Sequence, residues 1–173
     1  MVTAKLKDPA KVLGMLKRMT EPLWFEGPKR ALAEAALEEV KRSFDTQTDP
    51  WGRPWKRSIR AELESGETLS DTGRLRRSIT YRILSGGFAL GTNVKYAAIH
   101  QFGAVIKPKN VKNKKGEPYL RFKIGSRRKK RGRWVTKKTP VRIPARPFIS
   151  YPGLSDRWMR AFEDALEAYF RDG

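Results

Sequence analysis

The stretch GTNVKYAAIHQFG, from Gly91 to Gly103, carries one lysine and holds the single histidine of a strongly charged chain. Its apolar residues Val94, Ala97, Ala98 and Phe102 recur at helical spacing between a Gly-Thr-Asn start and a glycine stop. Apolar residues three or four positions apart share one face of a helix, so this pattern predicts a short, buried helical turn. The other elements are assigned relative to it.

Size and composition limit the class of protein. The chain has 173 residues, 39% hydrophobic and 10% aromatic, which is enough for one domain with its own core. Its formal net charge of +20 calls for acidic partners. The lack of cysteine excludes a disulfide framework and a thiolate metal site. No apolar run approaches the about 20 residues of a membrane span, and the first residues lack a signal's apolar core. We therefore expect a soluble protein made in a cytoplasm, with no membrane partner.

Three segments have the periodicity of amphipathic helices. Asp8 and Pro9 begin the first, which Pro22 ends. The second, residues 29–44, has an apolar residue at every fourth position, and the third, residues 155–170, has a wide and aromatic apolar face. These faces comprise Leu32, Ala36, Val40 and Phe44 in the second helix, and Trp158, Met159, Phe162, Leu166, Tyr169 and Phe170 in the third.

A hairpin is predicted directly before the Gly91–Gly103 stretch. Residues 78–84 alternate as a strand, residues 86–87 are a Gly-Gly pair suited to a tight turn, and residues 88–92 return. Turn-forming residues predict a loop at 45–57, and residues 58–70 are polar and predicted to be mobile or loosely helical.

Basic residues are concentrated between positions 107 and 142. This region has sixteen Lys or Arg and one acidic residue, Glu117, so it holds +15 of the net charge of +20. The interleaved Tyr119, Phe122 and Trp134 are typical of nucleic-acid surfaces, but also of an exposed hairpin whose apolar side packs down. An acidic protein surface is the favoured partner, while DNA contact and a merely solvated flap remain alternatives.

The basic region is predicted to form a long hairpin or flap. Residues 119–124 alternate as a strand, residues 133–143 can return antiparallel to it, and residues 125–132 form the exposed connection. The prolines in residues 143–149 remove donors from any ladder, so that segment is an extended edge or linker. The whole pattern indicates an α+β fold, with a mainly antiparallel sheet flanked by an N-terminal and a C-terminal helix.

The sequence offers few side chains that could form a catalytic site. His100 has no second histidine or cysteine with which to share a metal, and a core or interface role is the simpler interpretation. Glu62, Glu64, Glu67 and Asp71 lie in a hydrophilic stretch where solvated charge is expected. No phosphate-binding glycine loop occurs. We therefore expect no enzyme, no cofactor and no metal site.

Four motifs, in order, carry a resemblance. They are DPWGRPW at 49–55, LSDTGRL at 69–75, the Gly91–Gly103 stretch and IPARPF at 143–148. Together they resemble the phage virion morphogenesis family, the tail-completion or neck proteins of Mu-like and P2-like tailed phages. The resemblance extends from about residue 29 to the C-terminus, and the joint spacing of the motifs is more specific than any one of them.

The resemblance implies a structural virion protein at the head-proximal end of the tail or in the neck. Such a protein helps to complete the tail and to join it to the DNA-filled head, after assembly in the host cytoplasm. Related neck proteins form rings around the DNA channel, commonly with six copies. The implied partners are further copies in a hexameric ring and neighbouring neck, tail-terminator or head-closure proteins, with nonspecific contact to the channel DNA. A nucleic-acid-binding protein that uses residues 107–142 is the alternative.

A single domain over residues 1–173 is expected, in four parts. Residues 1–28 are an N-terminal extension, 29–104 hold the helix, loop and first hairpin, 105–143 form the basic hairpin, and 144–173 hold the extended segment and last helix.

The chain has more aromatic, extended and basic residues than one small core can bury, and we expect the remainder to form an assembly interface. For both tryptophans, burial beneath a loop remains the alternative. The residues expected there are Trp51, Trp55, His100, Gln101, Phe102, Arg127, Arg128, Lys129, Lys130, Arg131, Pro144, Arg146, Pro147 and Phe148.

Overall fold

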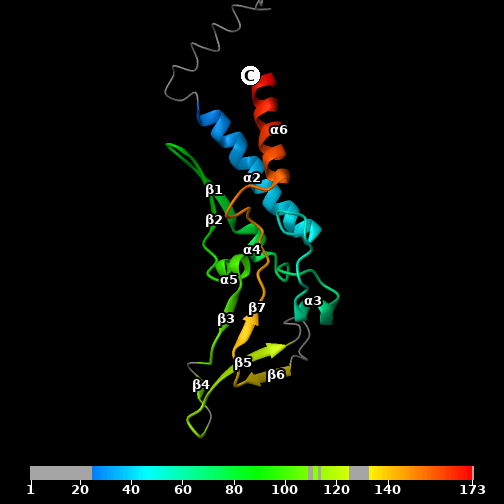
Figure 1. Ribbon diagram of the computed structural model, residues 1–173, viewed down its shortest axis with the longest axis vertical. Coiled ribbons are helices and arrows are strands. Elements are labelled where there is room, and N and C mark those ends of the chain that lie inside the picture. Colours follow the sequence, from blue (N-terminus) through cyan, green and yellow to red (C-terminus); the bar gives the residue numbers. More distant parts are fainter. Residues whose placement is uncertain (1–24, 109–110, 113, 125–132, 173) are drawn as a thin grey trace, which may run out of the picture.

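The computed structural model describes residues 25–108, 111–112, 114–124 and 133–172. A helical body occupies one end of its longest axis and a three-stranded arm the other (Figure 1). The helix expected between Asp8 and Pro22 and the connection at 125–132 lie outside the described residues.

Helix α2, Glu26–Thr46, is the longest element among the described residues and confirms the helix predicted at 29–44. Pro28 fits in its first turn, where a backbone N–H has no intrahelical partner. Val40 and Phe44 are 1% and 0% exposed, as the four-residue spacing predicts. The helix ends where Gln47 takes a left-handed conformation, with φ of 56°, and its N–H bonds the Ser43 carbonyl oxygen.

Helix α6, Asp156–Asp172, lies beside α2 and confirms the helix predicted at 155–170 (Figure 1). Ser155 caps it, because its hydroxyl accepts a hydrogen bond from the N–H of Trp158. Trp158 is 3% exposed and joins the core, but Met159 and Phe170 remain 44% and 41% exposed. The rest of the chain thus covers only part of the apolar face of α6.

The predicted hairpin forms β1, Ile79–Leu84, and β2, Gly87–Thr92. The strands pair antiparallel from Ile79 opposite Thr92 to Leu84 opposite Gly87, and both pack against α2. The polar stretch before them contains α3, Ile59–Glu64, and α4, Arg74–Arg77. The hairpin therefore delivers the chain to the 91–103 stretch as expected.

Helix α5, Ala97–Phe102, confirms the predicted turn but corrects its inward face. Ala97 and Gln101 are buried, whereas Ala98 is exposed and Phe102 is 63% exposed. The apolar spacing was misleading because the amide of Gln101 finds buried backbone partners, which makes a polar residue favourable on the inner side.

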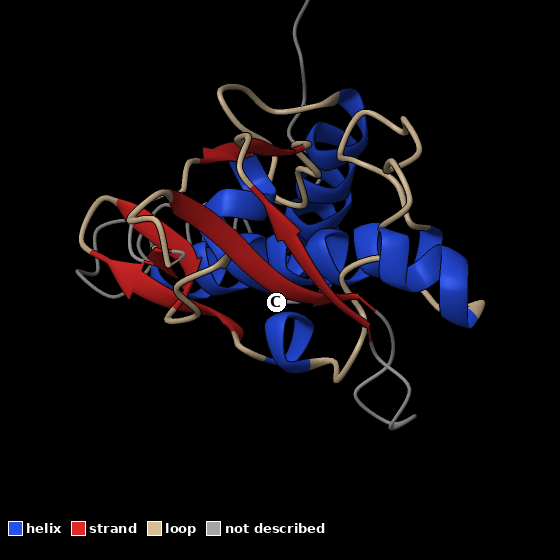
Figure 2. Ribbon diagram, turned by 90° about the horizontal axis from the view of Figure 1, so that it is seen from below, coloured by secondary structure: helices blue, strands red, loops and turns tan. Residues whose placement is uncertain are grey.

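The strands of the described residues form three small sheets in place of one larger sheet. Strand β3, Ala104–Ile106, pairs with β7, Val141–Ile143, and these two connect the body to the arm (Figure 1). The arm contains β4, Val111–Lys112, β5, Pro118–Ile124, and β6, Arg133–Lys137, in that order and all antiparallel. In Figure 2, which looks along the long axis from below, strands cross in front of the helices.

The basic hairpin is confirmed for β5 and β6 and wrong for the segment after them. Residues 141–143 were expected to continue along 119–124, but they pair with β3. The β6 ladder stops at Lys137, and Pro140 cannot donate to a ladder, so the chain leaves the arm there.

The core joins the long helices to the motif segments. Phe44 lies at its centre, with its ring centroid 5.4 Å from that of Trp55 and 5.6 Å from that of Phe148. Leu75, Ile79, Val94 and Trp158 complete the same buried cluster. Within the described ranges, no helix has the length and hydropathy needed to cross a bilayer.

Candidate assembly surfaces

The motif segments are fastened to each other at Gln101, which is 7% exposed. Its Nε2 donates to the carbonyl oxygen of Ile149 at 2.8 Å, and its Oε1 accepts from the N–H groups of Phe148 and Ile149 at 3.1 and 3.2 Å. The N–H of Arg146 donates to the His100 carbonyl oxygen at 2.6 Å. Residues 146–149 thus run along α5, held by one backbone hydrogen bond and three hydrogen bonds of the Gln101 side chain.

Gly103 permits this close approach. Its φ is +74°, and a Cβ at this position would lie 3.0 Å from both the nitrogen of Ala145 and the carbonyl oxygen of Ile143. Those neighbours are backbone atoms, so they cannot make room by changing rotamer as a side chain can. Only glycine fits where β3 leaves α5.

Four residues expected at an interface are buried inside this chain. Trp55 is 6% exposed, and its indole Nε1–H donates to the Pro147 carbonyl oxygen at 2.9 Å. Phe148 is 1% exposed, and Gln101 and Arg146 are also buried. The burial that remained an alternative for the tryptophans therefore holds for Trp55. These four side chains pack within the chain.

Trp51 and Phe102 are exposed. We use the name apolar surface for the exposed side chains of Trp51, Phe102, Tyr151 and Leu154, which come as two pairs. Phe102 and Tyr151 are 63% and 62% exposed, and their rings meet edge to face at 5.8 Å. Trp51 and Leu154, 41% and 48% exposed, line one shallow cavity of about 290 Å³. Clustered exposed apolar side chains are typical of a surface that another protein covers.

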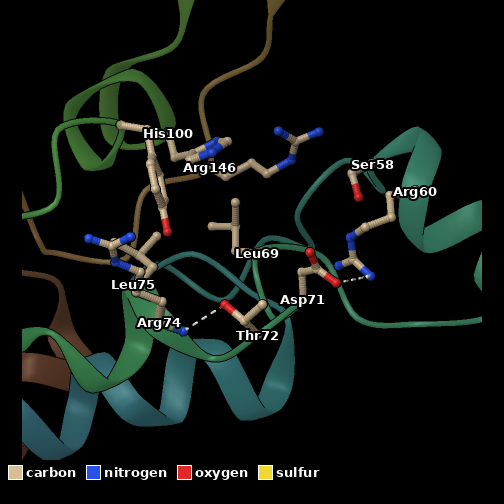
Figure 3. Close-up of a pocket in the computed structure, with 10 residues that line it drawn as sticks. Ser58, Arg60, Leu69, Asp71, Thr72, Arg74, Leu75, His100 and Arg146 are labelled. Carbon is tan, nitrogen blue, oxygen red and sulfur yellow. Dashed lines mark hydrogen bonds and ion pairs between the residues drawn. The ribbon is translucent and has the colours of Figure 1, made fainter. Parts of the chain in front are cut away.

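A second feature, the cationic cavity, lies where three motifs meet. It measures about 450 Å³, and Figure 3 shows His100 and Arg146 on one side with Arg60 and Asp71 on another. The polar side chains that line it are Ser58, Arg60, Asp71, Thr72, Arg74, Tyr96, His100 and Arg146.

Arg146 is the least exposed cation of the cavity, at 5%. Its Nε donates to the carbonyl oxygen of Lys56 at 2.7 Å, which ties the loop before α3 to the proline-rich segment. Burial lowers the pKa of the Arg146 guanidinium. Across the described ranges no carboxylate makes an ion pair with Arg146 or Arg74, so these charges face the cavity uncompensated.

His100 lies against these charges. Its pKa is lowered from the ordinary value of 6.5, first by burial and second by the positive charge of Arg146. Its Nδ1 is buried and has no hydrogen-bond partner among the described residues, and its ring meets that of Tyr96 at 5.9 Å. In the part of the chain that the structure covers, no three His, Asp or Glu side chains gather as metal ligands.

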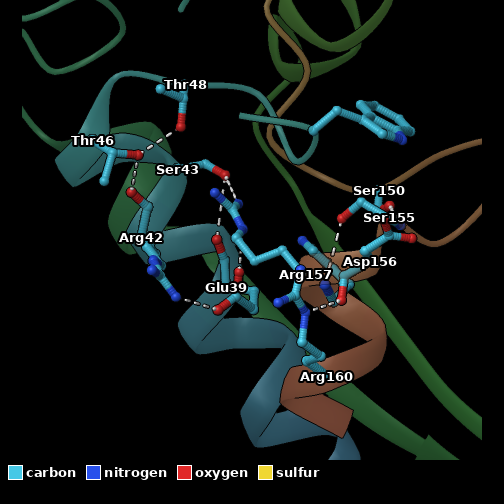
Figure 4. A network of polar contacts seen from close by, with 12 residues as sticks. Glu39, Arg42, Ser43, Thr46, Thr48, Ser150, Ser155, Asp156, Arg157 and Arg160 are labelled. Carbon is cyan, nitrogen blue, oxygen red and sulfur yellow. Dashed lines mark hydrogen bonds and ion pairs between the residues drawn. The ribbon is translucent and has the colours of Figure 1, made fainter. Parts of the chain in front are cut away.

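An ion pair joins α2 to α6. Figure 4 shows Glu39 between Arg42 and Arg157, with Arg157 also donating to the Ser43 hydroxyl. The distance from the Arg157 Nε to Glu39 Oε2 is 2.5 Å, and the Glu39 side chain is 8% exposed. This buried pair fixes the position of α6 on α2.

The arm presents an exposed aromatic residue among cations. Trp134 is 57% exposed, and the Arg121 guanidinium lies over its ring at 4.6 Å. The Lys138 Nζ lies 2.7 Å from a carboxylate oxygen of Glu117, the one acidic residue in the sequence from 107 to 142. Residues 127–131, the predicted basic contact, lie outside the described residues.

Pro144 and Pro147 are half-buried in the extended segment that Gln101 and Trp55 hold. Sequence reasoning missed the contributions of Arg60, Arg74 and Tyr151 to these surfaces. The joint spacing of the motifs could have pointed to the cavity, because motifs that recur together often meet in space. No periodicity indicated the exposure of Tyr151.

Comparisons with known proteins give the family of this chain. A model described as the phage virion morphogenesis family matches residues 8–171. The "Mu-like prophage FluMu G protein 2" of Haemophilus influenzae is 28% identical over 151 residues, which cover 86% of this chain and 83% of the relative. No solved structure matches the chain. The family match covers far more than half of the sequence, and the chain therefore belongs to the phage virion morphogenesis family.

Proposed function

We propose that this virion morphogenesis protein is a structural component of the neck, where it completes the tail and joins it to the DNA-filled head. Membership of the family supports the role in virion assembly. The position at the head-proximal end of the tail, and a ring of about six copies there, are the finer parts of the proposal. Its neighbours would be other neck, tail-terminator or head-closure proteins.

The observation that carries the proposal is the outward orientation of Phe102. The motif around it uses Gln101 to bind residues 148–149 and Ala97 to fill the core, yet Phe102 is 63% exposed and its ring meets that of the equally exposed Tyr151. A large apolar side chain on a rigid support, at the water boundary, is typical of an interface core.

The elongated shape suits a connector. Residues of α3, α4 and α5 line the cationic cavity, and the arm lies beyond α5 and the β3–β7 pair (Figure 1). One copy can thereby contact copies in its own ring through the body and a protein of the next ring through the arm.

The test is a phage in which this gene is deleted, examined by negative-stain microscopy. The proposal predicts filled heads and separate tails. A normal number of joined particles would contradict it.

A point variant locates the contact. Phe102→Ser should reduce joined particles strongly while the purified protein still folds, because the ring is exposed. Leu63→Ser is the matched control, since Leu63 is 64% exposed on α3 and lies outside the apolar surface. Equal loss in both variants would argue against a specific role of the apolar surface.

A second candidate is nucleic-acid binding by the arm. It is favoured by Trp134, which is exposed under the Arg121 guanidinium and is available to stack on a base. We prefer a protein partner, because a channel that must let DNA slide gains nothing from gripping it tightly.

A further inference from the structure

The cationic cavity holds positive charge that the described part of the chain does not neutralise. Arg146 is 5% exposed, and its Nε donates to a neutral carbonyl oxygen, that of Lys56. Removing a guanidinium from water is costly unless a carboxylate or another anion compensates it. An anion supplied from outside the chain would remove this cost.

The rest of the wall also favours an incoming carboxylate. Arg74 is exposed and makes no ion pair with any described carboxylate, so its guanidinium is free to bind. The Arg60 Nη1 lies 3.8 Å from Glu64 and 3.9 Å from Asp71, and its Nη2 donates to the carbonyl oxygen of Glu67, so Arg60 is already partnered within the chain. The Arg74 guanidinium can therefore offer the forked N–H groups that bind a carboxylate in a bidentate manner.

The acidic residues beside the cavity argue against a DNA backbone as its occupant. Asp71 lines the cavity, and Glu64 lies behind Arg60. A chain of phosphates passing over this site would be repelled by both carboxylates. One or two acidic side chains bring less negative charge near these carboxylates than a chain of phosphates does.

Exposed carboxylates of the matching kind lie on α6. Glu163, Asp164 and Glu167 are exposed, and none of them makes an ion pair with a described residue. Glu163 and Glu167 are four residues apart, so they share one side of the helix, next to the exposed Met159. An acidic face with an apolar edge is unusual on a chain of net charge +20.

One copy cannot place this acidic face in its own cavity. Figure 1 shows the C-terminal half of α6 at the end of the body remote from α3 and α5, which border the cavity. The acidic face and the cavity are also different patches. A contact between them joins two copies head to tail, and such a contact closes into a ring when its rotation closes.

We propose that the cationic cavity receives carboxylates of Glu163 and Glu167 from a second copy of this chain. The inference rests on the self-association that belongs to the proposed function. It adds the two surfaces that meet and the chemistry that joins them.

Charge reversal tests the contact by analytical ultracentrifugation of the full-length protein. Arg74→Glu alone, and Glu163→Lys with Glu167→Lys, should each weaken self-association by about tenfold or more. Combining both changes in one chain should recover much of the loss, because the reversed charges attract again.

Matched controls separate the contact from net charge. Arg82→Glu changes the net charge as Arg74→Glu does, at an exposed position of β1, and should associate as the wild type does. Glu38→Lys serves the same purpose for the acidic face, since its side chain is 69% exposed on α2.

Three results would overturn the inference: a wild-type protein that stays monomeric, an Arg74→Glu variant that associates normally, or a combined variant weaker than either parent. Loss of duplex-DNA affinity in Arg74→Glu with unchanged self-association would assign the cavity to phosphate instead. Head–tail joining is scored separately, so normal joining by a protein with no such contact would reject this inference and leave the proposed function standing.

Discussion

The amide of Gln101 determines where the proline-rich segment runs. It makes three hydrogen bonds to the backbone of residues 148–149, in a region where Phe148 is almost fully buried. A polar side chain is stable in this core because its amide nitrogen donates one hydrogen bond and its oxygen accepts two.

Gln101→Leu should therefore destabilise the protein. The buried N–H of Phe148 and the carbonyl oxygen of Ile149 would lose their partner, and unfolding should require about 3 kcal/mol less free energy. Urea denaturation followed by tryptophan fluorescence measures this change. Lys95→Leu, at an exposed position before α5, is the control and should remain within about 0.5 kcal/mol of the wild type. Indistinguishable unfolding midpoints for the two variants would show that the amide does not hold the segment.

His100 should make stability depend on pH. Its folded pKa lies below the ordinary value of 6.5, so between these two values the unfolded chain binds more protons than the folded chain. The free energy of unfolding is then unaffected by this group well above pH 6.5 and decreases as the pH falls from 6.5 toward the folded pKa.

The measurement is urea unfolding at about pH 7.5 and about pH 5.5, for the wild type and for His100→Gln. The variant should lose less stability over this interval, because it lacks the titrating ring near Arg146. Identical losses in both proteins would mean that His100 titrates normally. The same variant also tests the expectation that the protein is not an enzyme. Loss of His100 should then change folding or assembly and should not abolish any enzymatic turnover.

Among the secondary-structure elements, the attachment of α6 to α2 depends on a buried ion pair. Glu39→Ala would leave Arg157 without its carboxylate, and should lower the free energy of unfolding by about 3–5 kcal/mol. Glu38→Ala, one residue away, removes a pair with Lys41 whose carboxylate is 69% exposed, and should cost less than about 1 kcal/mol. Thermal unfolding of both variants measures the contrast. Equal costs would show that burial of the pair has no energetic consequence.

Local sequence patterns predicted these elements well where one face of an element is clearly apolar. The four-residue spacing of α2 and the alternation of β1 and β2 are examples, and both were confirmed. The pairing of β7 with β3 could not be predicted, because alternation identifies a strand but not its partner. The face of α5 was missed because Gln101 is favourable inside only when residues 148–149 are already in place.

For the candidate surfaces too, local sequence patterns predicted part of the result, and the rest depended on contacts between distant segments. The motifs identified Trp51 and Phe102, which are exposed, but spacing alone could not separate them from Trp55 and Phe148, which are buried. The cavity required the fold, since Arg74 and Arg146 lie far apart in the sequence.

For the molecule as a whole, the uneven distribution of charge is the main feature. Residues 107–142, which include the strands of the arm, hold +15 of the net charge of +20. Partners must supply the compensating anions, and the two candidates respond differently to salt. Ion pairs at a protein interface weaken moderately as salt screens them, whereas DNA binding falls steeply with the number of phosphates neutralised.

Replacing Arg127, Arg128, Lys129, Lys130 and Arg131 by Ser distinguishes the two partners. We expect head–tail joining to be lost while affinity for duplex DNA changes little. A variant with Arg30, Lys56, Arg82 and Lys95 changed to Ser removes exposed charge from the body and should still join heads to tails. Lost DNA affinity with normal joining would assign the arm to DNA.

Joining in vitro tests most directly whether this protein connects the two halves of the virion. Filled heads and free tails are collected from a phage that lacks the gene, purified protein is added, and joined particles are counted by negative-stain microscopy. We predict that joined particles increase with the added wild-type protein and not with the Phe102→Ser variant. Joining to the same extent without the protein, or none at any concentration of it, would contradict the account.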